Sequence, residues 1–241
     1  MQKSKIEWTD YTSNPVKGYC PMACSYCYAR KMYERFGWDK TIHFDAYEIF
    51  KAHRILKPSR IFVGSMIELF GDWMKDGWLE DIFCDIGKCP QHTFQLLTKQ
   101  PQNLARFSPF PPNVWVGVSA TNREQYLNAT DSLDGIDAAI KFVSFEPLLE
   151  PIAISECQLN AVNWVIIGQQ TPSSKKTSPK IEWIMDIVEA CDKVRIPVFL
   201  KDNLIPVVAS CADCGACAKQ FKIEGLLLDD NLKLRQEFPC I

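Results

Sequence analysis

Three cysteines, Cys20, Cys24 and Cys27, lie within eight residues near the start of the chain. Their spacing is C-x3-C-x2-C, and Tyr26 directly precedes the third cysteine. A loop this short can turn three thiolates toward one point, which suits a soft metal centre and leaves one coordination position that the loop does not fill. A structural zinc site made of four cysteines usually has two C-x2-C pairs, and this loop contains one. The spacing therefore favours an iron–sulfur centre over zinc.

The residues around the cysteines argue against a purely structural role. Gly18, Pro21 and Ser25 indicate an irregular loop rather than a packed face, so three core cysteines are a poor interpretation. The motif resembles the signature of the radical S-adenosylmethionine (radical SAM) superfamily. That resemblance implies that the three thiolates hold a 4Fe–4S cluster and that S-adenosylmethionine chelates the fourth iron. It further implies an external one-electron donor, reductive cleavage of S-adenosylmethionine and hydrogen abstraction from a substrate.

A second group of cysteines lies near the other end of the chain. Cys211, Cys214 and Cys217 have the spacing C-x2-C-x2-C, and Cys240 is a candidate fourth ligand. The spacing resembles the compact run that binds ferredoxin-type 4Fe–4S clusters, and the small residues between the cysteines let the backbone wrap closely. A second 4Fe–4S cluster is the first interpretation. Structural zinc and free or redox-active thiols are the alternatives.

Composition limits the class of protein. The chain has 241 residues, 47% of them hydrophobic, with a net charge of −2, which suits a soluble domain at the upper end of the usual size or an α/β barrel with a small appendage. No apolar run is long enough to span a bilayer and the N-terminus lacks a secretory segment, so we expect a cytoplasmic protein without a membrane partner. Eleven cysteines then indicate metal binding better than disulfides. The charge balance argues against a general electrostatic nucleic-acid binder, although a local basic patch remains open.

The middle of the chain alternates short apolar runs with helical patterns. Helices are predicted over residues 28–36, around Leu79, Ile82, Phe83 and Ile86, over 123–133 and over 181–194. Strands are predicted over residues 60–64, 94–97, 114–118, 140–143, 164–167 and 198–200. This alternation is typical of a parallel sheet covered on both faces, and an open doubly wound sheet has the same periodicity. We expect a partial (β/α) barrel of about six parallel strands at residues 1–203 and a small cysteine-rich extension at residues 204–241.

Further segments resemble one branch of the superfamily, an uncharacterised phage-associated family of radical-SAM-like proteins. The chain departs from that branch at Ser13 and at Gln169 and Gln170, so substrate contacts at the latter strand end are not carried over. The matching segments extend over most of residues 1–201 and are 5–10, 14–16, 64–66, 68–70, 96–99, 115–119 and 144–149.

Polar residues follow several predicted strands, where α/β folds place their ligands. The resemblance implies that Gly64, Ser65 and Met66 bind the amino group of S-adenosylmethionine and that Tyr26 lies near its adenine. The alternative for Gly64, Ser65 and Met66 is an ordinary turn that ends a strand, and the alternative for Tyr26 is an aromatic residue of the core.

The cationic and hydroxyl groups of later strand ends complete the predicted cofactor site. Lys99 is a candidate partner for the cofactor carboxylate, with a solvated lysine as the alternative. Ser119 and Ser144 are candidates for the ribose hydroxyls. Glu146 is flanked by apolar residues and would be costly to bury without a partner, which favours a role with the ribose or a substrate. Lys201, which closes the last strand, is a weaker candidate for substrate contact.

These observations lead to one hypothesis and two rivals. The leading hypothesis is a cytoplasmic radical SAM enzyme whose substrate is unknown, with a nucleic-acid base, a peptide and a small metabolite as candidates. The rivals are a non-catalytic zinc-binding scaffold and an iron–sulfur electron carrier that does not cleave the cofactor.

Overall fold

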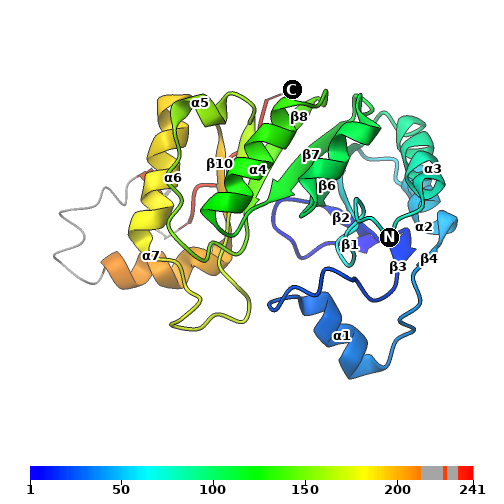
Figure 1. The fold of residues 1–241 in the computed structure, drawn as a ribbon, viewed down its shortest axis with the longest axis horizontal. Coiled ribbons are helices and arrows are strands. Elements are labelled where there is room, and N and C mark those ends of the chain that lie inside the picture. The colour runs from blue at the N-terminus through cyan, green and yellow to red at the C-terminus, as the bar shows by residue number, and fades with distance from the viewer. Residues whose placement is uncertain (213–224, 227–232, 241) are drawn as a thin grey trace. The chain divides into compact units, whose positions relative to one another are not determined.

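A computed structural model describes residues 1–212, 225–226 and 233–240. The chain divides into two compact units, Met1–Gly117 with Ile136–Ala139, and Val118–Gly135 with Ile140–Ile241. Both units combine helices with mostly parallel strands (Figure 1). The α/β class predicted from the sequence is therefore confirmed.

The first unit is built on parallel strands whose carboxyl ends lie at one edge. Its sheet strands, in spatial order, are β1 (Gln2–Lys3), β2 (Tyr11–Ser13), β5 (Arg60–Val63) and β6 (Thr93–Thr98). Ser13 pairs with Val63, and Val63 pairs with Leu96, while β1 adds antiparallel to β2. The residues that follow β2, β5 and β6 are therefore neighbours, although the chain separates them by tens of positions.

Helices and a small second sheet complete the first unit. Its remaining elements are β3 (Val16–Lys17), α1 (Tyr28–Phe36), β4 (His43–Phe44), α2 (Ala46–Phe50), η1 (Lys51–Arg54), α3 (Asp76–Gly87) and η2 (Pro101–Phe107). Leu79, Ile82 and Ile86 are buried on one face of α3, as their spacing predicted. The helix α1 ends at Gly37, which adopts a left-handed φ of +61°, the conformation typical of a glycine that terminates a helix.

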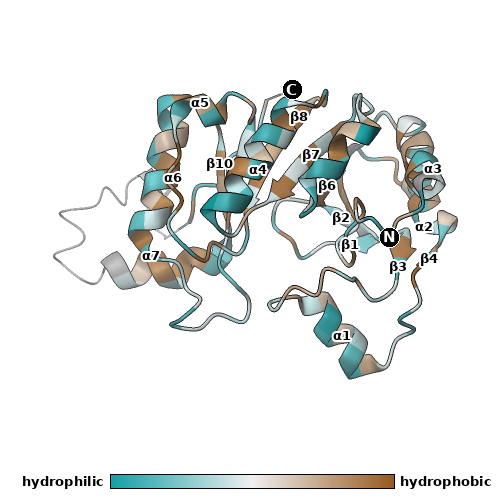
Figure 2. Ribbon diagram, in the orientation of Figure 1, coloured by the Kyte–Doolittle hydropathy of each residue, from teal (hydrophilic) through white to brown (hydrophobic). Residues whose placement is uncertain are grey.

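The second unit repeats the parallel arrangement. Its strands are β8 (Ile140–Phe145), β9 (Trp164–Ile167) and β10 (Val198–Leu200), and β7 (Val114–Ser119) crosses the boundary between the units. Its helices are α4 (Arg123–Asp134), α5 (Glu156–Leu159), α6 (Ile181–Lys193), η3 (Asp202–Leu204) and α7 (Ile205–Ala212). The helices α4, α5 and α6 lie side by side in Figure 1. Along α6, hydrophilic (teal) and hydrophobic (brown) residues alternate in Figure 2, and the apolar residues Ile184, Ile187, Val188 and Cys191 are buried.

Residues 233–240 return to the edge of β10. The amide of Leu200 donates to the carbonyl of Arg235 over 2.8 Å, and the amide of Glu237 donates to the carbonyl of Val198 over 3.0 Å, in an antiparallel sense. The ring of Phe238 lies 5.4 Å from that of Trp164. The described part of the predicted extension therefore packs on the second unit, and the boundary at residues 203 and 204 stays a prediction.

The predicted strands and helices agree with the structure to within two residues at each end, apart from the helix around Leu79, for which no bounds were predicted. The described residues contain eight strands in the largely parallel set, more than the six or so expected. The barrel form remains a prediction. Among the described helices, none combines the length and apolarity that crossing a bilayer requires.

Candidate functional site

The loop between β3 and α1 carries Cys20, Cys24 and Cys27. Tight turns shape it: Ala23 has a φ of 49°, and the amide of Cys27 donates to the carbonyl of Cys24 over 3.0 Å. The loop is entered through Gly18, whose φ is +126°. A Cβ there would lie 2.6 Å from the Cα of Ile42, so this close backbone approach requires glycine.

The three thiols have different surroundings. Cys20 is buried, whereas Cys24 and Cys27 are half-buried. Burial raises the pKa of Cys20, and the nearby Cys27 thiol also acts to raise it, while the backbone amides of Glu68 and Met22 hydrogen-bond the sulfur and act in the opposite direction. Burial raises the pKa of Tyr26 as well, and its hydroxyl lies within hydrogen-bond reach of Cys24.

Donor chemistry and geometry give different answers about a metal. Three thiols on one short loop, two of them partly accessible, fit the protein ligands of a 4Fe–4S cluster in type and number. Across residues 1–212, 225–226 and 233–240, however, no group of three or more His, Cys, Asp or Glu side chains is gathered closely enough to hold a metal. The three sulfurs would have to turn together to bind one.

The predicted segment Gly64–Met66 lies against the end of the cysteine loop. The amide of Gly64, with a φ of +83°, donates to the carbonyl of Ser13 over 2.9 Å. The Ser65 hydroxyl and the Met66 amide both donate to Asn14 Oδ1, over 3.2 and 3.1 Å. The hydroxyl of Tyr28, the residue directly after Cys27, donates to the carbonyl of Ser65 over 2.7 Å. The structure thus brings two of the sequence-predicted groups together.

The buried carboxylate of Glu68 connects this segment to the end of β6. It accepts hydrogen bonds from the Thr98 hydroxyl over 2.7 Å, the Lys99 amide over 2.7 Å and the Phe70 amide over 3.0 Å. Three donors compensate the charge of this carboxylate inside the protein. The backbone of Lys99, a predicted cofactor residue, is therefore fixed close to the segment that faces Cys20.

Two further contacts support the loop from outside the predicted set. Arg30 Nη1 donates to the carbonyl of Cys20 over 2.6 Å, and its guanidinium lies 3.8 Å from the centroid of the Tyr19 ring. Gln100 Nε2, one residue beyond Lys99, contacts the sulfur of Met22 at 3.1 Å. Sequence reasoning missed the roles of Asn14, Glu68 and Arg30. The only local signals were an asparagine before a proline, a glutamate within an apolar segment and an arginine in the first turn of a helix.

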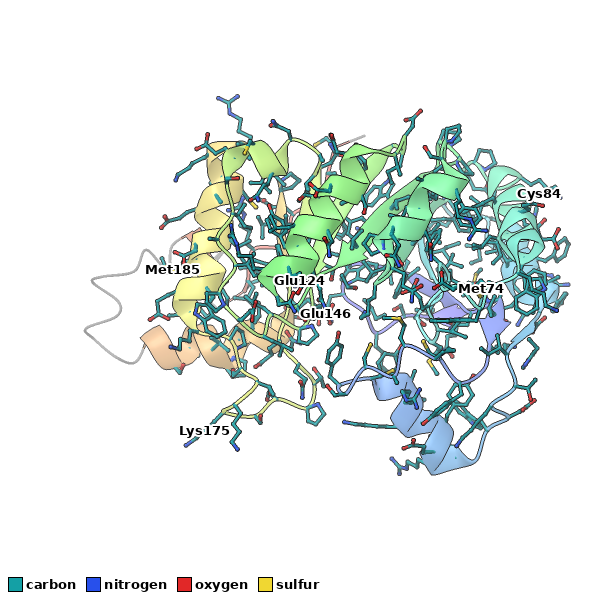
Figure 3. The ribbon with its side chains drawn as sticks, in the orientation of Figure 1. Met74, Cys84, Glu124, Glu146, Lys175 and Met185 are labelled. Atoms are coloured by element: carbon teal, nitrogen blue, oxygen red, sulfur yellow. The ribbon has the colours of Figure 1, made fainter. Side chains whose placement is uncertain are left out.

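The remaining cofactor candidates belong to the second unit. Ser119 and Ser144 are both buried, and Ser144 Oγ has no hydrogen-bond partner among the residues that the structure describes. Glu146 (Figure 3) pairs with Lys201, and both side chains lie over Gly168. A Cβ at Gly168 would be 3.0 Å from Lys201 Cδ and 3.3 Å from Glu146 Cγ. Lys201, a weak candidate from the sequence, is thus the charge partner that Glu146 was expected to need.

Gln169, at the end of β9, is one of the positions at which the chain departs from the resembled branch, and its polar groups form hydrogen bonds within the protein. Gln169 is buried, its amide donates to Asn203 Oδ1 over 3.2 Å, and Asn203 Nδ2 donates back to its carbonyl over 2.9 Å. Ser178 donates to Gln169 Oε1 over 2.9 Å. These bonds tie the end of β9 to the residues after β10.

The second cysteine group is only partly visible. Cys214 and Cys217 lie outside the described residues, and for Cys211 the structure describes the backbone at the end of α7 but not the side chain. Cys240 is exposed. Its segment continues past the amino end of β10, whereas α7, which contains Cys211, begins after the carboxyl end of that strand. The auxiliary metal site stays a prediction. Of the unassigned cysteines, Cys89 and Cys191 are buried, and Cys84 and Cys157 are exposed.

Comparison with known proteins gives one match. Residues 3–226 match a family model described as a protein of unknown function (DUF5131). No curated protein matches the chain, and no solved structure does. Because the match covers most of the 241 residues, the chain belongs to the DUF5131 family.

Proposed function

We propose that this protein is a radical SAM enzyme that holds a 4Fe–4S cluster through Cys20, Cys24 and Cys27. The observation that carries the proposal is the contact between the cysteine loop and the ends of β5 and β6. The Glu68 amide faces the Cys20 sulfur, and the Tyr28 hydroxyl bonds the Ser65 carbonyl. The cysteine ligands, the segment Gly64–Met66 and Lys99 are thereby neighbours within one compact unit.

Each of these groups has a defined task in the proposal. A bound 4Fe–4S cluster would supply the electron that cleaves the sulfonium of S-adenosylmethionine. The backbone carbonyls of Gly64–Met66 would accept hydrogen bonds from the cofactor ammonium, and the positive φ of Gly64 allows the backbone to turn there. Lys99 would pair with the cofactor carboxylate. Arg30 holds the carbonyl of Cys20 and so limits the movement of the loop.

Three further predicted cofactor residues belong to the second unit. From the resemblance alone, we propose that Ser119, Ser144 and Glu146 bind the ribose or the substrate. A buried hydroxyl without a partner calls for an explanation, and a polar ligand atom supplies one for Ser144. Lys201 forms an ion pair with Glu146 and so supplies a charge partner for that partly buried carboxylate.

The cellular setting follows from the same chemistry. Reduction requires an external one-electron donor, and oxygen-sensitive thiolate ligands suit the reducing cytoplasm. We therefore place the enzyme there, without a membrane partner. Its substrate class is taken up below.

Metal analysis and cofactor turnover test the proposal. Protein reconstituted without oxygen should be brown, carry about four or eight irons per chain and release 5′-deoxyadenosine when given S-adenosylmethionine and a reductant. Cys24→Ala should abolish that release, whereas the exposed Cys84→Ala should not change it. Colourless protein with zinc at both cysteine groups would establish the scaffold instead. Iron without cofactor cleavage would establish an electron carrier.

A further inference from the structure

A cluster of aromatic rings and cations belongs to α1, the helix labelled in Figure 1, and to the residues next to it in the first unit, and apart from Arg30 its members have no task in the proposed cofactor chemistry. We call it the α1 patch. Phe36 and Trp38 are 54% and 41% exposed, which is unusual for such large rings. The patch consists of the rings of Tyr19, Tyr33, Phe36 and Trp38 and the cations of Arg30, Arg35 and Lys40.

The rings of the α1 patch are held in fixed relation to one another. Phe36 and Trp38 are stacked, with centroids 5.4 Å apart and planes 22° apart. Trp38 also meets Tyr33 edge-on at 5.3 Å, and its amide donates to the Tyr33 carbonyl over 3.2 Å. The left-handed turn at Gly37 makes this return of the chain possible. Two exposed rings therefore form a preorganised platform.

Cations surround the platform. Arg35 lies 5.3 Å from the centroid of Phe36, and Lys40 lies 4.7 Å from that of Tyr19. The neighbouring acids are engaged within the chain, since Glu34 accepts from the Tyr19 hydroxyl and Asp39 accepts from the Thr41 amide over 2.9 Å. Residues 28–41 contain four Lys and Arg against two Asp and Glu, although the whole chain has a net charge of −2. The sequence left a local basic patch open, and the structure places the cations of Arg30, Arg35 and Lys40 beside the rings of the α1 patch.

We propose that the α1 patch binds single-stranded nucleic acid. Proteins that bind single strands combine cations for the phosphates with aromatic platforms for the bases. Phe36 and Trp38 would stack successive bases, and Arg35 and Lys40 would pair with phosphates. A duplex hides its base faces, and an acidic peptide would use the cations but not the stacked rings. The exposed ring pair therefore favours a single strand.

This inference deepens the proposed function, and it rests on that function only in taking the bound strand as substrate. Arg30 links the two regions, because it stacks on Tyr19 in the α1 patch and bonds the carbonyl of Cys20. A strand on the α1 patch would thus lie next to the proposed cluster ligands. Binding itself needs neither reductant nor S-adenosylmethionine.

Fluorescence anisotropy of the full chain with labelled oligo-dT and oligo-U of about 15 nucleotides tests the inference. Phe36→Ala and Trp38→Ala should each weaken binding about 5- to 100-fold, the effect of losing one stacked base. The double variant Arg35→Gln, Lys40→Gln should reduce the slope of log affinity against log salt by about 1.4. Far-ultraviolet circular dichroism establishes that each variant is folded.

One control matches the removal of a ring, and a second matches the removal of two positive charges. Phe50→Ala removes another exposed ring, on α2, and Lys175→Gln with Lys176→Gln removes two charges from the exposed loop after β9 (Lys175 in Figure 3). Neither should alter binding by more than about twofold. Equal loss in the controls, equal affinity for duplex or poly-glutamate, or no binding at low salt would overturn the inference. Failed binding with intact 5′-deoxyadenosine release would refute this inference alone, and the reverse result would refute the proposed function alone.

Discussion

Gly64 and Glu68 show how single residues at the end of β5 set the local geometry. Gly64 turns with a φ of +83°, and Glu68 receives three hydrogen bonds from three different residues. A glycine and a carboxylate four positions apart therefore join the segment after β5 to both β2 and β6. This is the framework on which the cysteine loop rests.

Replacing Gly64 should lower the stability of the protein more than replacing another glycine with a positive φ. In Gly64→Ala the new Cβ would lie 2.5 Å from Leu69 Cγ, so strain in the left-handed region adds to overpacking. We expect a loss of about 2–4 kcal/mol in the free energy of unfolding, measured with urea. The matched control is Gly37→Ala, with a φ of +61° and no atom within 4 Å of its Cβ, which should lose about 1–2 kcal/mol. Equal losses would contradict the predicted clash.

Among the elements, α6 contains a titratable group that should make stability depend on pH. Cys191 sits on its buried face, and burial raises the pKa of this thiol to about 12, against about 8.5 in an unfolded chain. Between these values the unfolded chain has lost a proton that the folded chain keeps. Stability from this group is thus complete below about pH 8.5 and falls as the pH rises.

The free energy of unfolding should therefore decrease by about 2 kcal/mol through Cys191 alone between pH 8 and pH 10. Cys191→Ala should lower stability at both pH values but reduce this pH-dependent loss by that amount. Cys157→Ala, at an exposed position, should leave the pH dependence as it is. A pH dependence unchanged in Cys191→Ala would show that the thiol is not held protonated.

The segment at residues 233–240 should stabilise the second unit. The Phe238 ring packs against Trp164 and Phe199, and Arg235 pairs with Asp192 at 2.7 Å. Because Phe238 is half-buried, Phe238→Ala should cost about 2 kcal/mol. Leu56→Ala, which truncates a side chain that is 90% exposed, should change stability by less than about 0.5 kcal/mol. Indistinguishable urea midpoints for the two variants would contradict the packing role.

At the scale of the whole molecule, the eleven cysteines should differ sharply in reactivity. Cys84 and Cys157 are exposed, whereas Cys89 and Cys191 are buried. Alkylation requires that the reagent reach the sulfur and that the thiol be ionised. Iodoacetamide at neutral pH should therefore label Cys84 and Cys157 and spare Cys89 and Cys191 until urea is added. Peptide mass spectrometry reads out each site. Labelling of Cys89 or Cys191 in the native protein would contradict the described core.

The repeating part of the fold was predictable because its information is local. Trp164–Ile167 and Val198–Leu200 are short apolar runs ended by polar or glycine residues, and both are strands with the predicted bounds. The helix predicted over residues 181–194 is likewise observed as α6 with nearly the same bounds. Residues 46–54 gave no such signal, because α2 and η1 are too short to establish a period.

The pairings within the candidate site were less predictable because they are not local. Glu146 and Lys201 are 55 positions apart and meet only through the shared register of β8, β9 and β10. The pairing of β10 with residues 235–237 likewise joins segments that are far apart in the sequence. The sequence supplied the residue types and the strand ends. It did not specify which side chains would meet across them.

One consequence of the pairing at β10 concerns association with other chains. β10 is the last of the strands in its sheet, and a bare edge of this kind recruits foreign strands. Here residues 235–237 occupy that edge from within the same molecule, and the guanidinium of Arg235 anchors them to α6 through Asp192. Residues 235–237 thus protect the edge of β10 from pairing with another chain. A copy lacking this segment would be prone to self-association as its concentration rises.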